Sequence, residues 1–274
     1  MRIASACALT LVMALLAAAG LEAQRRGGGR GGGFAPRVAT PQDFDGSFQF
    51  CRVAFRQSRG GDGGGWGVDY PRADQNLSIR LSELTKTHVS FDANHDPNHV
   101  VVRLTDETLF QCPFIMLTEP GGAFLDESEA AALRNYLLKG GFLWADDFWG
   151  EYAWEAWVEQ LGKALPPGPF PIVDLPPDHP MFHEQFIVTK VPQIPSINFW
   201  AGSGGGTSER GGDSAVPRAR AIVDTQGRIM VLMTHNTDLG DSFEQEAADP
   251  RYFLEFSVDG YAFGINVLLY AMTH

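Results

Sequence analysis

The stretch from Lys139 to Gly150, K-G-G-F-L-W-A-D-D-F-W-G, restricts the possible folds more than any other part of the sequence. Before it, apolar residues recur at helical spacing over Asp126–Lys139, and Glu129 completes a capping box at the start of that helix. A glycine then provides the left-handed residue that often ends a helix. Phe142–Ala145 follows as an uninterrupted apolar run, which is typical of a strand buried on both faces of a parallel sheet.

Two adjacent acids, Asp146 and Asp147, follow this predicted strand directly. Open α/β sheets present their ligand sites in this way, beyond the carboxyl ends of the strands. Strands and helices alternate along the chain, which predicts a mostly parallel, doubly wound sheet. Ala219–Asp224 and Ile229–Thr234 flank a polar turn and predict a hairpin, and a last helix is expected over 260–272. The predicted fold is therefore α/β, with a C-terminal hairpin and helix.

Other elements follow from the same patterns. Strands are also expected over Phe48–Phe55, His88–Phe91, Val100–Leu104, Pro113–Thr118 and Ile172–Leu175. A helix is expected from Asp74, as its N-cap, to Lys86, and another through Trp154–Leu161. Cys51 and Cys112 both lie in apolar strand-like runs, so we expect buried free thiols rather than a disulfide.

The N-terminus resembles a secretory signal over residues 1–23, because Arg2 precedes an apolar run that ends in small residues. A membrane anchor is the alternative, but the run is short for a span of about 20 residues. Residues 24–43 are rich in glycine and arginine and are expected to form a flexible linker. Residues 44–274 are expected to form one exported domain, periplasmic or extracellular, with no membrane span after cleavage.

The predicted domain is strongly acidic. Without residues 1–35, which hold four arginines and one glutamate, the chain carries 17 basic and 32 acidic side chains, a net charge of −15. This charge argues against nucleic acids and anionic lipid surfaces as partners. It is compatible with metal cations, basic proteins or neutral substrates.

Acidic residues gather at three places where a predicted strand ends or a predicted helix begins. The groups are Asp69 with Asp74; Asp146 with Asp147 and Glu151; and Asp238 with Asp241 and Glu244. If they meet at one sheet edge, their carboxylates could bind Ca²⁺ or Mg²⁺, or act as acid and base in glycoside hydrolysis. The alternative for each acid is a structural role in a helix cap or turn. Whether a metal binds is left open.

Site roles follow from these positions. Asp146, Asp147 and His235 are the candidate catalytic residues. The candidate ligand-binding residues are Asp69, Asp74, Trp149, Glu151, Asn236, Asp238 and Asp241. The sequence has no Gly-x-Ser-x-Gly or Gly-x-Cys-x-Gly elbow, so acyl transfer by serine or cysteine is not expected.

Six segments carry a resemblance to a known family. They are D-Y-P-R-A-D-Q-N-L (69–77), L-F-Q-C-P-F-I-M-L-T (109–118), L-R-N-Y-L-L-K-G-G-F-L-W-A-D-D-F (133–148), H-P-M-F (179–182), H-N-T-D-L-G-D-S-F-E (235–244) and G-I-N-V-L-L-Y-A-M-T-H (264–274). On these segments, residues 48–274 resemble an uncharacterised bacterial family, the domain of unknown function numbered four-one-five-nine.

That family is similar to class I glutamine-amidotransferase-like folds, including trehalose-utilisation-type proteins. The resemblance implies a flavodoxin-like three-layer sandwich. Amidotransferases carry a cysteine elbow after a central strand, and the equivalent place here holds Asp146, Asp147 and Phe148. The resemblance therefore does not imply glutaminase activity, and it brings no established reaction.

Two functions remain open. The first is an exported protein that binds, and could hydrolyse, a carbohydrate or another small polar ligand, with Ca²⁺ or Mg²⁺ as the candidate cofactor. The second is a non-catalytic envelope module whose acids bind a basic protein partner. Convergence of Asp69, Asp147 and Asp238 on one point would favour the first function, and dispersal over the surface would favour the second.

Overall fold

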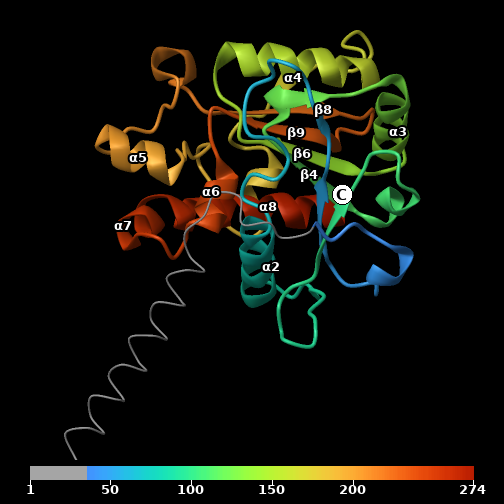
Figure 1. The fold of residues 1–274 in the computed structure, drawn as a ribbon, viewed down its shortest axis with the longest axis horizontal. Helices are drawn as coiled ribbons and strands as arrows, with labels where there is room; N and C mark the ends of the chain where they lie inside the picture. The colour runs from blue at the N-terminus through green and yellow to red at the C-terminus, as the bar shows by residue number, and fades with distance from the viewer. Residues whose placement is uncertain (1–35) are drawn as a thin grey trace, which may run out of the picture. The chain divides into compact units, whose positions relative to one another are not determined.

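A computed structural model of the chain describes residues 36–274 (Figure 1). The predicted signal at 1–23 and the linker residues before 36 lie outside this range. Residues 36–43, expected in the linker, pack on the domain, since Val38 pairs with Val101 across a parallel bridge. Within the described residues, none of the helices combines the length and the apolar character that crossing a membrane requires.

The central sheet has seven strands in the order β3-β1-β4-β6-β9-β8-β7. Their bounds are β1 Phe50–Val53, β3 His99–Val102, β4 Phe114–Thr118, β6 Phe142–Asp146, β7 Val173–Asp174, β8 Arg218–Val223 and β9 Ile229–His235. The pairs from β3 to β9 are parallel, whereas β8 is antiparallel to both β9 and β7. The expectation of a mostly parallel sheet with a terminal hairpin is confirmed.

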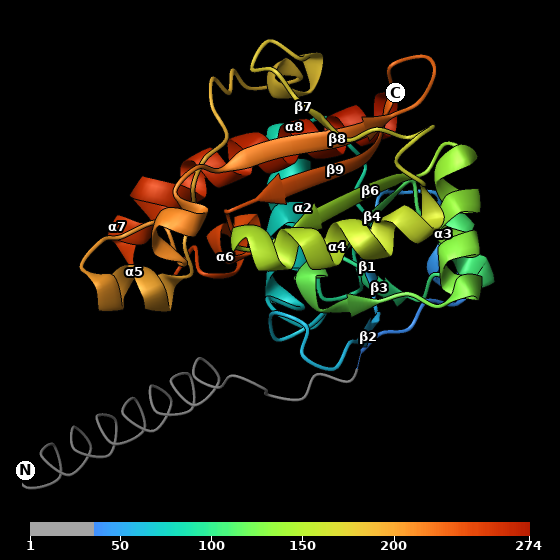
Figure 2. The ribbon, with the colours of Figure 1, turned by 90° about the horizontal axis from the view of Figure 1, so that it is seen from above.

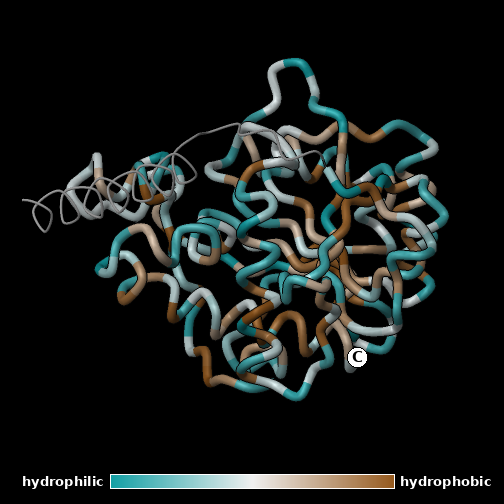
Figure 3. Tube along the Cα trace, turned by 60° about the horizontal axis from the view of Figure 1, so that its bottom comes forward, coloured by the Kyte–Doolittle hydropathy of each residue, from teal (hydrophilic) through white to brown (hydrophobic). Residues whose placement is uncertain are grey.

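Helices lie on both faces of this sheet (Figure 2). The long helices are α2 Arg72–Leu84, α3 Glu127–Leu138, α4 Gly150–Ala164 and α8 Val258–Thr273. Successive residues of β6 point to opposite faces. Phe142 and Trp144 pack into a core with α2 and α8, and Leu143 and Ala145 into a second core with α3 and α4. Burial on both faces explains why this strand is apolar throughout, and Figure 3 shows hydrophobic segments gathered inside the hydrophilic loops.

Several predicted elements have the expected boundaries. The α3 helix has Asp126 as its N-cap, which accepts hydrogen bonds from the backbone of Ser128 and Glu129, and the capping box is formed. Gly140, at φ +105°, follows the helix in the left-handed conformation. The α8 helix covers the predicted range 260–272 and extends beyond it at both ends.

Two predicted elements are wrong. The α2 helix begins at Arg72 with Pro71 at its N-cap, so Asp74 lies inside the first turn and does not cap it. Asp74 instead points into the protein, towards Arg52. Residues 88–91 do not form a continuous strand, because Val89 pairs with Phe48 and Phe91 pairs with Pro97, each in an isolated bridge.

Several short elements were not anticipated from the sequence. They are a two-stranded sheet of β2 Arg56–Gln57 and β5 Ala123–Phe124, the helices α5 Ile197–Ser203, α6 Leu239–Glu244 and α7 Pro250–Tyr252, a π-helix at Phe253–Ser257, and 3₁₀ turns at Pro41–Asp43, Pro120–Gly122 and Gly211–Ser214. Two further 3₁₀ turns, at Glu107–Gln111 and Pro180–His183, agree with the helical turn and the turn that the sequence predicts at 106–110 and 178–182. The most important of the short elements is α6, because it contains Asp241 and Glu244 and has Asp238 as its N-cap, all three of them acids singled out from the sequence.

The expectation of free cysteines is wrong, because Cys51 and Cys112 form a disulfide. Cys51 lies in β1, and Cys112 lies two residues before the neighbouring strand β4. Both side chains enter the core shared with α3 and α4, and their Cα atoms are 6.1 Å apart, within disulfide range. A sequence separation of 61 residues concealed this proximity.

Candidate functional site

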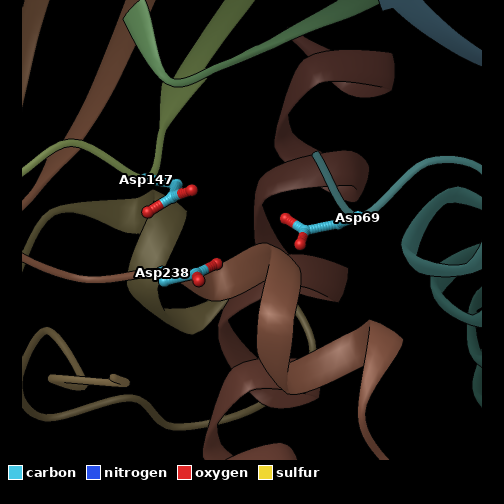
Figure 4. Close-up of side chains that lie close together, drawn as sticks. All are labelled: Asp69, Asp147 and Asp238. Atoms are coloured by element: carbon cyan, nitrogen blue, oxygen red, sulfur yellow. The ribbon is translucent and has the colours of Figure 1, made fainter. Parts of the chain in front are cut away.

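Three aspartates from separate segments converge at the carboxyl edge of the sheet (Figure 4). Asp147 follows β6, Asp238 is the N-cap of α6 after β9, and Asp69 lies in the loop before α2. One carboxylate oxygen of each lies within 4.8 Å of the others. Only 7% of Asp69, 7% of Asp147 and 3% of Asp238 is exposed to solvent. The sequence-based criterion of convergence on one point is therefore met, and the carboxylates are buried.

A second acidic group shares one member with the first. Asp69, Asp241 and Glu244 also place one oxygen each within 4.8 Å of one another. Asp241 and Glu244 are three residues apart in α6, a spacing that puts both side chains on one face of the helix. The two groups therefore lie side by side, with Asp69 common to both.

In three aspartates of the two groups, one carboxylate oxygen accepts a hydrogen bond from an N–H group of the protein. Trp149 Nε1 donates to Asp147 Oδ1 at 3.1 Å, and the Asp241 amide donates to Asp238 Oδ1 at 2.8 Å. The Ile197 amide donates to Asp241 Oδ2 at 2.7 Å. Asp69 differs, because its Oδ2 atom is buried and has no hydrogen-bond donor in the described part of the chain. A buried carboxylate oxygen without a partner is costly, and the usual partner is a proton or a cation.

Asp146 occupies a different environment from its neighbour Asp147. It is fully buried and accepts hydrogen bonds from the Thr234 hydroxyl and from the backbone N–H groups of Leu239 and Gly240, at 2.9 and 3.1 Å. Burial raises the pKa of Asp146 to about 7, although these hydrogen bonds act in the opposite direction. Asp146 thus fixes the first turn of α6 against β6, and thereby positions Asp238 at the start of that helix.

The electrostatics of the site favour a positively charged occupant. Burial raises the pKa values of Asp69, Asp147 and Asp238 well above the ordinary range, and neighbouring carboxylates raise them further. Burial also raises the pKa of Asp241, to about 7. Within residues 36–274, no lysine or arginine forms an ion pair with any of these four aspartates.

Strained backbone marks the same edge of the sheet. Glu119, Asp147 and Asn236 directly follow β4, β6 and β9, and their φ angles are +51°, +59° and +62°. Asp69 also has a positive φ, +62°. A side chain in this left-handed region costs on the order of 1–3 kcal/mol, and such residues cluster at functional sites. Three neighbouring strands therefore end in the same kind of strained corner, each with a polar side chain.

Asp74, predicted to bind a ligand, is not brought into the acidic groups. It forms an ion pair with Arg52, and both side chains are fully buried. Arg52 Nε lies 3.0 Å from each oxygen of Asp74, and Arg52 Nη1 donates to the Thr118 hydroxyl at 2.6 Å. These contacts show that Asp74 serves as the counter-charge of the buried Arg52.

His235 and Asn236 contact the turn at the start of α4. The Nε2 atom of His235 is 3.0 Å from the Gly150 carbonyl, and its ring packs against Phe148 and Trp154. Burial lowers the pKa of His235 to about 4, so the ring is neutral at pH 7. Asn236 Oδ1 accepts from the Gly150 amide at 2.8 Å. Both residues hold this turn in place beside Asp147.

The two predicted ligand-binding residues near the start of α4 have different environments. Trp149 is buried and contacts Asp147 through its indole nitrogen. Glu151 is exposed to solvent at the first turn of α4, and its own amide donates to Asp213. Only Trp149 of these two touches the acidic groups.

Glu119 was not predicted from the sequence. It follows the buried strand β4 as Asp147 follows β6, accepts a hydrogen bond from the Gly65 amide, and raises the pKa of Asp147 by repulsion. Burial raises the pKa of Glu119 itself to about 7. The rule that identified Asp147, an acid directly after a buried strand, would also have identified Glu119.

Comparison with known protein families identifies the family to which the chain is similar. Residues 49–272 fit a family model described as "Domain of unknown function (DUF4159)", which spans nearly all of the described chain. No curated protein matches the chain. The matched description states no reaction, ligand or partner.

Proposed function

Because the chain belongs to the DUF4159 family, whose description gives no activity, we propose its function from the site itself. The protein binds a divalent cation through Asp69, Asp147 and Asp238, and the cation holds a small polar ligand. One observation carries the proposal: three buried carboxylates lie within 4.8 Å of one another, and Asp69 Oδ2 lacks any donor among residues 36–274. Carboxylates this close cannot all ionise unless a positive charge joins them.

The chemistry of the ligand atoms favours a hard cation. All candidate ligand atoms are carboxylate oxygens, and neither acidic group contains a cysteine or histidine. Ca²⁺ and Mg²⁺ prefer such oxygen sites, whereas structural Zn²⁺ sites use sulfur or nitrogen ligands. We therefore propose Ca²⁺ or Mg²⁺ as the cofactor.

Burial favours binding over hydrolysis. The carboxylates are at most 7% exposed, so a sugar ring could not contact them directly, whereas a bare cation needs only their oxygen atoms as ligands. A carbohydrate would reach the site by offering hydroxyl oxygens to the cation. Buried acids are also poorly placed to recognise a basic protein, which disfavours the alternative of an envelope interaction module.

The strand order supports a flavodoxin-like arrangement as part of this proposal. Taken in chain order, the five parallel strands lie in the order 2-1-3-4-5, which is the flavodoxin-like order of doubly wound sheets. In such folds ligands bind beyond the carboxyl ends of the strands. Asp147 then occupies the strand-to-helix corner where amidotransferases carry their cysteine, which supports a reused site with different chemistry.

Export remains part of the proposal. The disulfide between Cys51 and Cys112 supports an oxidising compartment, where disulfides persist. It is consistent with a cleaved signal at residues 1–23 and a location in the periplasm or outside the cell.

Calorimetric titration of the chelator-treated protein with Ca²⁺, Mg²⁺ and Zn²⁺ tests the proposal. We expect saturable binding of Ca²⁺ or Mg²⁺ that Asp147→Asn weakens at least tenfold, because one of three shared ligands loses its charge. The matched control is Asp178→Asn, which removes an exposed acid. If none of the cations binds the wild-type protein, or if both variants bind equally well, the proposal is wrong.

A further inference from the structure

The structure assigns a second cation to this site, with the carboxylate of Asp69 as the bridge between the two. The inference rests on the proposed function and deepens it. The first cation lies among Asp69, Asp147 and Asp238, and the second among Asp69, Asp241 and Glu244. A carboxylate has two oxygens, so a single aspartate can bind one cation with each.

Asp69 has the contacts that a bridging ligand needs. It is the one residue common to both groups, and its buried Oδ2 atom meets no hydrogen-bond donor of residues 36–274. Figure 4 shows the Asp69 side chain pointing towards Asp147 and Asp238 from the opposite side of the site. Both groups therefore share this carboxylate.

Gly240 lets the Asp69 carboxylate lie directly against α6. A Cβ atom at Gly240 would lie 2.2 Å from Asp69 Oδ2 and 3.3 Å from Asp238 Oδ1. The residue is inside α6, where glycine costs roughly 1 kcal/mol relative to alanine. Any larger residue at this position would displace the Asp69 carboxylate from its place in both groups.

Charge balance favours two cations over one. The two groups together contain five carboxylates. One divalent cation would leave three negative charges in a mostly buried site, whereas two would leave one. Arg52 cannot provide the missing charge, because its guanidinium is engaged by Asp74. Uncompensated buried charge is strongly destabilising. The second cation would neutralise two of the three negative charges that remain after the first.

Each group can be removed separately, which allows a direct test. We would measure bound Mn²⁺ per chain by equilibrium dialysis with metal analysis, and record the electron paramagnetic resonance spectrum of the loaded protein. Mn²⁺ replaces Mg²⁺ at oxygen sites. We expect two Mn²⁺ per wild-type chain, and a spin-coupled spectrum because one carboxylate joins the two ions.

The variants Glu244→Gln and Asp147→Asn should each bind one Mn²⁺ and give the uncoupled spectrum of an isolated ion. Glu255→Gln is the matched control on an exposed glutamate and should keep both ions. One ion in the wild-type protein, unchanged in Glu244→Gln, would overturn the bridged pair and leave the proposed function standing. No bound ion in the wild type would overturn both.

Discussion

At the scale of single residues, chemically identical neighbours have different roles. Asp146 ends β6 and accepts hydrogen bonds from three donors, whereas Asp147 leaves the strand and accepts one, from Trp149 Nε1. The sequence predicted that this pair would lie at the sheet edge. It could not separate the two roles, because the donors to Asp146 come from residues about 90 positions later in the chain.

Asp74 provides a residue-scale prediction. Asp74→Asn leaves the buried Arg52 without its counter-charge, so we expect a loss of about 3–5 kcal/mol in the free energy of unfolding, measured by urea denaturation. Cation binding per folded molecule should remain at the wild-type value, because Asp74 belongs to neither acidic group. Asp178→Asn serves as the control and should change stability by less than about 0.5 kcal/mol. A stable Asp74→Asn variant that no longer binds cations would instead make Asp74 a ligand.

At the scale of elements, the sequence predicted the long, periodic segments and missed the short ones. The β6 strand and the α3 helix contain their own signals, an apolar run and a capping box. The α6 helix has only six residues, and its first turn is held by Asp146 from β6. A helix this short depends on contacts with distant segments, so local patterns do not reveal it. The acids of α6 were identified, but the helix that groups them was not.

The disulfide gives a prediction at this scale, because it ties β1 to the start of β4. It closes a loop of 61 residues, so its removal should lower the free energy of unfolding by up to about 4 kcal/mol. We expect Cys51→Ala/Cys112→Ala to show this loss in urea denaturation. The exported protein keeps only Cys51 and Cys112, because Cys7 lies in the signal proposed to be cleaved. Alkylation of the denatured exported protein should label neither cysteine without reductant and both after reduction. Two labelled cysteines without reductant would contradict the pairing.

At the scale of the whole molecule, the buried acids should determine how stability varies with pH. Burial raises the pKa values of Asp146, Asp241 and Glu119 to about 7, so the folded protein holds protons that the unfolded chain releases near pH 4. Between pH 4 and 7 the folded state therefore binds more protons than the unfolded state. Its stability should fall as pH rises, by up to about 1.4 kcal/mol per pH unit for each carboxyl group.

Thermal unfolding in the presence of a chelator tests this expectation. The melting temperature should be lower at pH 8 than at pH 5, and added Ca²⁺ or Mg²⁺ should raise it more at pH 8, because fewer protons compete with the cation for the carboxylates as pH rises. His235 acts in the opposite direction within the same range and offsets part of this effect, because its lowered pKa destabilises the fold as pH falls from 6.5 to about 4. Equal melting temperatures at pH 5 and pH 8 without cations would refute the expectation.

The left-handed corners after β4, β6 and β9 bear on how this protein can evolve. Glycine is the residue that such a backbone accepts without strain, yet these positions hold Glu119, Asp147 and Asn236. A substitution of any of the three by glycine would relieve the backbone strain and, at Asp147, would also remove one of the three converging carboxylates. Selection for stability and selection for the proposed cation site would thus act in opposite directions on the Asp147 codon. Lineages that retain these side chains are therefore expected to use the site. Glycine substitutions at these corners would be the wrong way to make the protein more heat-resistant, because they would remove side chains of the site.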